Sequence, residues 1–133
     1  GLAHALAALA VEGSELDPAS ARAAALASKL RTLADAIPGV RSMVLVDSDG
    51  RGLVSSVDAW RDRDFSDRVW FRTPKAERDW TRLYLSPPWR TTLGRWTMPL
   101  SRIVVARDGS FAGVAVAALD PNYFEVLLRS VRH

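Results

Sequence analysis

Two arginines and three aromatic side chains lie together in one short segment near the middle of the chain. Arg68 and Arg72 carry guanidinium groups, which bind carboxylates through paired hydrogen bonds. Trp70 and Phe71 offer apolar walls that exclude water from such a contact. On a helix, Arg68, Phe71 and Arg72 share one face because they are three and four residues apart. The spacing favours a pocket for a small organic acid, although Arg68 can instead pair with Asp64 on the surface.

Strand alternation adds further candidates for the wall of such a pocket. Tyr84 and Ser86 share one face of a predicted strand, and Trp96 and Met98 share one face of the next. Tyrosine and tryptophan each combine an apolar body with a polar group, which suits a hydrated pocket wall. The same side chains also occur as ordinary core residues, and methionine is more often found there.

The composition disfavours an enzyme. The chain has no cysteine, and its two histidines, His4 and His133, lie at the two ends. Thiolate chemistry, Cys/His metal sites, an interior histidine base and an axial haem ligand are therefore excluded, and we expect no cofactor. The carboxylate pairs that remain, at positions 47 and 49 and at 62 and 64, fall in a turn and in a charged loop, where turn formation and surface charge explain them.

The charge pattern disfavours nucleic acid as a partner. Eighteen basic residues stand against fifteen acidic ones, for a net charge of +3. Between residues 61 and 82, seven bases and five acids are interleaved, which is typical of a solvated surface rather than a basic binding face. The longest apolar run, residues 113–119, is far shorter than the roughly 20 residues that cross a bilayer.

Residues 1–37 form a long N-terminal helical segment in this interpretation, with a kink near residues 13–18, where Asp17 and Pro18 can start a new helix. Its second half carries a seam with a period near 3.5 residues, made of Ala19, Ala23, Leu26, Leu30, Leu33 and Ile37. The seam predicts packing on the domain's own sheet, contact with a second copy of the chain, or both.

Residues 38–133 are predicted to be an α+β core with a five-stranded antiparallel sheet. The hairpin is the clearest element, because an Asp-Gly turn separates two apolar runs. A short helix after Ser66, closed by Pro74, forms an insert, and a final helix begins at Asp120 and Pro121. The last strand is apolar on both faces, so both faces of the sheet should be covered. The predicted strands are residues 40–46, 52–57, 81–86, 95–106 and 110–119.

Four stretches, in this order, resemble the extracytoplasmic Cache (PDC) sensor domains of bacterial transmembrane receptors, which are PAS-like. They are residues 44–50 (VLVDSDG), 65–72 (FSDRVWFR), 94–102 (GRWTMPLSR) and 108–124 (DGSFAGVAVAALDPNYF). Together with the N-terminal helix, the resemblance covers nearly the whole chain. It implies the membrane-distal module of a paired sensor in a diguanylate cyclase, histidine kinase or chemoreceptor. The long helix should then pack on the sheet, which also carries the helical insert.

The resemblance also implies a ligand pocket between the sheet and the insert, to which the segment around Arg68 contributes an arginine and aromatic side chains. Members that bind amino acids place an aspartate on the last strand, where it meets the ligand's ammonium group. The matching position here is Ala118, and Asp120 follows two residues later, where its place before Pro121 favours a helix cap. Phe71 also stands where that subfamily has tyrosine. Binding of an amino acid is therefore disfavoured, and a carboxylate or another small ligand remains open.

The leading hypothesis is thus a periplasmic, ligand-binding sensor domain of an inner-membrane protein, which passes its signal through flanking helices. The alternative is a ligand-free structural or dimerisation module of the same kind of receptor, which uses the N-terminal helix as a homodimer contact. In both readings the chain itself is not an enzyme, and any kinase or cyclase lies elsewhere in the parent protein.

Overall fold

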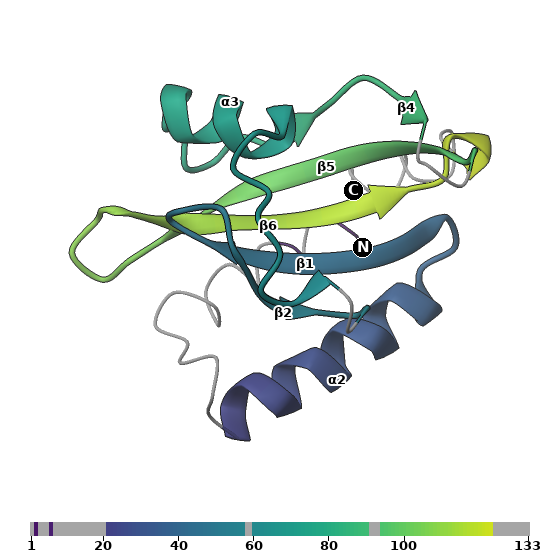
Figure 1. Cartoon of the computed structure of the whole chain (residues 1–133), viewed down its shortest axis with the longest axis horizontal. Coiled ribbons are helices and arrows are strands. Elements are labelled where there is room, and N and C mark those ends of the chain that lie inside the picture. Colours follow the sequence, from purple (N-terminus) through teal and green to yellow (C-terminus); the bar gives the residue numbers. More distant parts are fainter. Residues whose placement is uncertain (1, 3–5, 7–20, 58–59, 91–93, 124–133) are drawn as a thin grey trace.

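A central antiparallel sheet separates two helices in the computed structural model, which describes residues 2, 6, 21–57, 60–90 and 94–123 (Figure 1). The sheet follows the order β2-β1-β6-β5-β3, and the short β4 pairs with the beginning of β5. This is the predicted α+β fold. The elements are α2 (Ala21–Ala36), β1 (Val40–Asp47), β2 (Gly52–Ser55), α3 (Val69–Glu77), β3 (Tyr84–Leu85), β4 (Trp89–Arg90), β5 (Trp96–Val105), β6 (Phe111–Leu119) and the 3-10 turn η2 (Pro121–Tyr123).

The β1–β2 hairpin forms as its Asp-Gly turn predicts. One carboxylate oxygen of Asp47 accepts the N–H groups of Asp49 and Arg51 at 2.9 and 3.0 Å. Gly50 has a φ of +89°, and a Cβ there would lie 2.7 Å from the Cα of Ser66 in the insert. A side chain at position 50 would clash with Ser66, so glycine is what allows the turn to pack this closely against the insert. The carboxylate at position 47 is thus structural.

The two faces of the sheet are covered by different helices, as the apolar last strand predicts. We call them the α2 face and the α3 face, and Figure 1 shows the two helices on opposite sides of the sheet. Buried residues on the α2 face include Leu26, Leu30, Met43, Leu45, Met98, Leu100, Ala117 and Leu119. Buried residues on the α3 face include Val44, Val46, Phe65, Trp70, Phe71, Tyr84, Ile103, Val114 and Val116.

The seam of α2 packs on the sheet. Ala23, Leu26 and Leu30 are buried there, and Leu33 and Ile37 are partly buried against the same cluster. Packing on the domain's own sheet is therefore confirmed, whereas a homodimer contact through this helix stays a prediction. Ala19, the kink near residues 13–18 and most of the final predicted helix lie outside the described residues.

The prediction that Pro74 closes the insert helix is wrong, because α3 continues to Glu77 with Pro74 inside it. Proline has no N–H, so the carbonyl of Trp70, four residues earlier, lacks its usual partner within the helix. The hydroxyl of Ser101 on β5 donates to that carbonyl at 2.9 Å. The bond that the proline removes is thereby replaced by one that fastens α3 to the sheet. The helix ends at Arg78, whose φ of 56° is left-handed.

Four strands are shorter than predicted, and β5 and β6 differ by only one residue at an end. The expected strand 81–86 is reduced to Tyr84–Leu85, because Thr81 turns back to bond the carboxylate of Asp79 through its N–H and its hydroxyl. Strand β2 ends at Ser55 rather than at residue 57. Strand β4 was not predicted, since the two prolines before it indicate a turn.

Candidate functional site

The α3 face carries a row of small residues across three neighbouring strands. Ser42 of β1 pairs with Ala118 of β6, which in turn pairs with Pro99 of β5. All three face the α3 side, because each lies an even number of residues from a strand neighbour in the α3-face cluster. One row further on, Tyr84 of β3 pairs with Ser101. The sheet thus presents a floor of small and hydroxyl-bearing side chains beside the aromatic residues of α3.

Two hydroxyls on this floor are buried with no hydrogen-bond partner among the described residues: the Oγ of Ser42 and the OH of Tyr84. Ser42 is 2% exposed and Tyr84 is 5% exposed. Burial is the main cause that raises the pKa of the Tyr84 hydroxyl; the nearby backbone of Asp79 lowers it, and the carboxylates of Glu77 and Asp79 raise it further. None of these groups meets the hydroxyl in hydrogen-bond geometry. Buried polar groups are nearly always paired, and an exception in a native fold calls for an explanation.

Aromatic side chains pack beside this floor. The Trp70 ring lies 5.5 Å from that of Phe65, and the Phe71 ring meets that of Phe111 edge-on at 5.9 Å. The ammonium group of Lys75 lies 5.5 Å from the Phe71 ring centroid and donates to the carbonyl of Ser48 at 3.0 Å. The turn of the first hairpin is thus tied to α3 and to its aromatic layer.

The two candidate arginines lie at the surface end of this region. Arg68 is the N-cap residue of α3, with its Nε 4.0 Å from a carboxylate oxygen of Asp67. The alternative partner of Arg68, Asp64, instead accepts the N–H of Ser66 at 2.9 Å. Arg72, one turn along, is exposed. A ligand-binding role for Arg68 and Arg72 stays a prediction.

The remaining candidates divide between the two faces. Ser86, two residues beyond Tyr84, donates its N–H to the carbonyl of Pro99 on the α3 face at 2.9 Å. Met98 is buried on the α2 face, and Trp96, two residues before it, is 53% exposed at the end of the sheet. The structure therefore brings Tyr84, Ser86 and Ala118 to one face, but it does not bring Trp96 and Met98 there.

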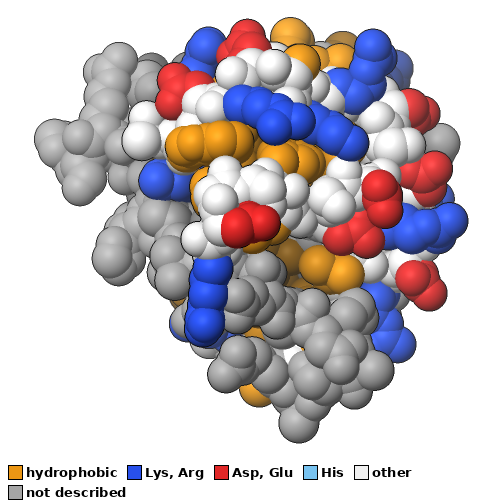
Figure 2. Space-filling view, turned by 90° about the vertical axis from the view of Figure 1, so that its left-hand side faces the viewer, with side chains coloured by type: hydrophobic (Ala, Val, Ile, Leu, Met, Phe, Trp, Pro, Cys, Tyr) orange, Lys and Arg blue, Asp and Glu red, His pale blue; other side chains and the backbone are white. Residues whose placement is uncertain are grey.

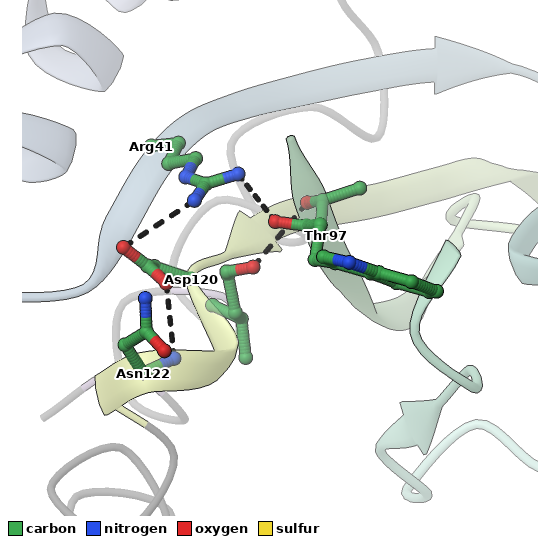
Figure 3. A network of polar contacts seen from close by, with 6 residues as sticks. Arg41, Thr97, Asp120 and Asn122 are labelled. Atoms are coloured by element: carbon green, nitrogen blue, oxygen red, sulfur yellow. Dashed lines mark hydrogen bonds and ion pairs between the residues drawn. The ribbon is translucent and has the colours of Figure 1, made fainter. Parts of the chain in front are cut away.

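Asp120 closes the end of the sheet rather than lining its α3 face. One carboxylate oxygen accepts the N–H of Asn122 at 3.0 Å, which confirms the predicted cap, and the other lies 3.3 Å from the Nη2 of Arg41 (Figure 3). A second N–H of Arg41 reaches the carbonyl of Trp96. The hydroxyl of Thr97 donates to the carbonyl of Leu119 nearby at 3.3 Å.

Sequence reasoning missed Ser42, Ser101 and Arg41. Each is a polar residue inside an otherwise apolar strand. A polar side chain at a buried strand position needs a partner, so these interruptions are the signal that could have found them. Which partner each one meets depends on the strand order, and that order is not written in the local pattern.

The described residues offer neither a metal site nor a membrane-spanning helix. Within these residues, no group of three His, Asp or Glu side chains could hold a metal ion. No helix of the described part is long and apolar enough to span a membrane. On the side that lies to the left in Figure 1, Lys and Arg side chains alternate with Asp and Glu (Figure 2), in agreement with the interleaved charges of the sequence.

Comparison with solved structures identifies the fold. The extracellular domain of a protein described as a histidine kinase, rpHK1S-Z16, aligns with a TM-score of 0.79 and 29% identity, over 98% of this chain and 53% of that one. The sensor domain of the Vibrio cholerae histidine kinase DctB aligns over 81% of this chain and 41% of that one, with a TM-score of 0.66 and 20% identity. The chain has the fold of the Cache (PDC) sensor domains.

A third Cache-type neighbour is a chemoreceptor domain. The ligand-binding domain of the Pseudomonas aeruginosa PAO1 amino acid chemoreceptor PctC, solved with GABA, aligns over 95% of this chain and 57% of that one, with a TM-score of 0.67 and 21% identity. No protein-family model and no curated protein sequence matches the chain. The chain spans about half the length of these solved sensors. Since these neighbours are sensor and ligand-binding domains rather than catalytic ones, the domain is a non-enzymatic sensor domain.

Proposed function

We propose that this chain is an extracytoplasmic small-molecule sensor domain of a bacterial inner-membrane receptor, and that its ligand lies on the α3 face of the sheet. The observation that carries the proposal is the pair of buried hydroxyls, on Ser42 and Tyr84, that have no partner among the described residues. A bound polar molecule between the sheet and the insert would supply the hydrogen bonds that these groups need. The aromatic residues Trp70 and Phe71 would exclude water around it.

A small organic acid fits the chemistry of this face better than an amino acid does. Ala118 occupies the centre of the floor, between Ser42 and Pro99, and offers no carboxylate to an ammonium group. The candidate cations, on Arg68 and Arg72, belong to α3 and the residue that caps it. A ligand with its polar groups on Ser42 and Tyr84 and its carboxylate toward Arg68 would use both kinds of group.

The same geometry suggests how binding would be transmitted. Helix α2 leads directly into β1, which carries Ser42, and β6, which carries Ala118, leads directly into η2. A ligand that favours one arrangement of these strands would shift the population of the segments that flank the sheet. We propose that the chain is the membrane-distal module of a longer receptor, with a kinase or cyclase as output and a homodimer contact through the N-terminal helix.

A ligand screen by thermal unfolding tests the binding proposal. Mono- and dicarboxylates, amines and amino acids are tested against the unmodified chain and against Ser42→Ala, Tyr84→Phe and Arg68→Ala. A true ligand raises Tm in the unmodified chain and loses at least most of that shift in each variant. The control is Tyr123→Phe, because Tyr123 is 46% exposed and lies in η2, off the α3 face.

Three outcomes would revise or refute the proposal. Stabilisation that survives both Ser42→Ala and Tyr84→Phe would place the ligand elsewhere. If the compound still stabilises Arg68→Ala but neither of the other two variants, Arg68 is not part of the site, and the proposed roles of Ser42 and Tyr84 remain. A panel with no effective compound would favour the ligand-free structural module, for which sedimentation of the chain with Leu26 and Leu33 substituted is the direct test.

A further inference from the structure

A hollow lies at the end of the sheet, between the beginning of β1, the beginning of β5 and the 3-10 turn η2. It measures about 460 Å³, within the range of about 300–1,000 Å³ that is usual for small-molecule sites. We call it the end pocket, and Figure 3 shows the polar network at its rim. Among the described residues, it is lined by Arg41, Arg95, Trp96, Asp120, Pro121 and Asn122.

The guanidinium of Arg41 is held in place within this pocket. One terminal nitrogen donates to the Trp96 carbonyl, and the other lies 3.3 Å from a carboxylate oxygen of Asp120. Asp120 is itself fixed, because its second oxygen accepts the Asn122 N–H and its own N–H donates to the Gly39 carbonyl at 2.7 Å. These two contacts engage two of the five N–H donors of a guanidinium. A guanidinium oriented in advance loses little conformational entropy when it binds an anion.

The rest of the lining favours an anion with an apolar body. Among the described lining residues, two carry guanidiniums, Arg41 and Arg95, and one carries a carboxylate, Asp120. The side chain of Trp96 is 53% exposed, which is unusual for the largest apolar side chain in a folded domain. Its indole and the ring of Pro121 line the pocket together with the two cations.

We propose that the end pocket binds a small organic carboxylate, with the carboxylate on the guanidiniums of Arg41 and Arg95 and a planar apolar body against the Trp96 indole. This site is separate from the α3 face. Trp96 shares its strand face with Met98, which is buried on the α2 face, whereas Ser42 and Tyr84 belong to the α3 face. An occupant would touch the chain where α2 passes into β1 and where β6 passes into η2.

NMR titration of the chain with three matched probes tests the proposal. Benzoate, benzyl alcohol and benzylamine share one ring and differ in charge. Each of the five tryptophans has an indole N–H resonance, and Trp96→Phe assigns the relevant one. Benzoate should shift that resonance and bind at least tenfold more tightly than the other two probes. Arg95→Gln should weaken benzoate binding at least tenfold, whereas Arg31→Gln, an exposed arginine on α2, should leave it unchanged.

Other results overturn the proposal. Equal binding of all three probes would mean that the charges play no part. Benzoate binding that persists in Arg95→Gln, or that is lost in Tyr84→Phe instead, would place the anion outside the end pocket. Arg41→Gln is a second variant. It should abolish binding, but it also loosens η2, so it is a less specific test than Arg95→Gln. The contacts of Asp120 with Arg41 and Asn122 do not involve Arg95, so Arg95→Gln tests the charge without removing either of these bonds.

Discussion

Removal of the Tyr84 hydroxyl should stabilise the domain while it removes a ligand contact. This hydroxyl is buried without a partner among the described residues. Leaving a buried polar group unpaired costs about 1–3 kcal/mol, and Tyr84→Phe relieves that cost without changing the ring. The ring keeps its place beneath the guanidinium of Arg82, whose central carbon lies 5.0 Å from the ring centroid.

We expect a gain of about 1 kcal/mol in the free energy of unfolding at the lower end of that range. For 133 residues, an unfolding entropy of roughly 2.1 cal/mol/K per residue gives a rise in Tm of about 4 °C. Urea unfolding followed by tryptophan fluorescence measures the change, and an unaltered m-value shows that the unfolded state is the same. Tyr123→Phe is the control, since that side chain is exposed and should change stability by almost nothing.

A loss of stability in Tyr84→Phe would refute this reasoning. It would show that the hydroxyl has a partner in the free domain, so that nothing remains for a ligand to satisfy. The account would also fail if the variant gained stability but retained full ligand-induced stabilisation. Only the combination of a more stable free domain and a weakened ligand response agrees with a hydroxyl reserved for binding.

Further predictions concern the fastening of α3 and the response to acid. Ser101→Ala leaves the Trp70 carbonyl unpaired and should cost about 1–3 kcal/mol in urea unfolding. That loss should shrink in a Pro74→Ala background, because the new N–H can bond the same carbonyl; an equal loss in both backgrounds would contradict the replacement of one bond by the other. Hydrogen bonds from Ser66 hold the pKa of the Asp64 carboxyl below its usual 3.8. The stability that these bonds add is present above the usual pKa and is lost as pH falls through the lowered pKa. Asp64→Asn should therefore make the free energy of unfolding depend less on pH in acid. An unchanged pH dependence would show that these bonds do not contribute to stability.

The fold could be read from the sequence because its signals are local. The Asp-Gly turn, the seam of α2 and the doubly apolar last strand each reflect a short stretch of chain, and each was found where predicted. Pro74 shows the limit of such reasoning. A proline ends a helix when its neighbours offer nothing for the freed carbonyl, and here Ser101, which is 27 positions away in the sequence, offers a hydroxyl.

The candidate site was only half predictable for the same reason. Alternation along a strand says which residues share a face, but not which face of the sheet meets the insert. Strand alternation therefore proposes Tyr84 and Met98 for the same pocket wall, although the structure places them on opposite faces of the sheet. Ser42 was overlooked because its importance comes from the absence of a partner, which appears only when its neighbours across the strands are known.

The most direct test of a ligand on the α3 face uses the two tyrosines of the chain. Incorporation of 3-fluorotyrosine gives two fluorine NMR signals, one from the buried Tyr84 on the α3 face and one from the exposed Tyr123 in η2. Tyr123→Phe assigns them. A compound whose stabilisation is lost in Ser42→Ala should shift the Tyr84 signal and leave the Tyr123 signal almost unchanged. If such a compound moves only the Tyr123 signal, or neither, the ligand does not bind where the buried hydroxyls lie.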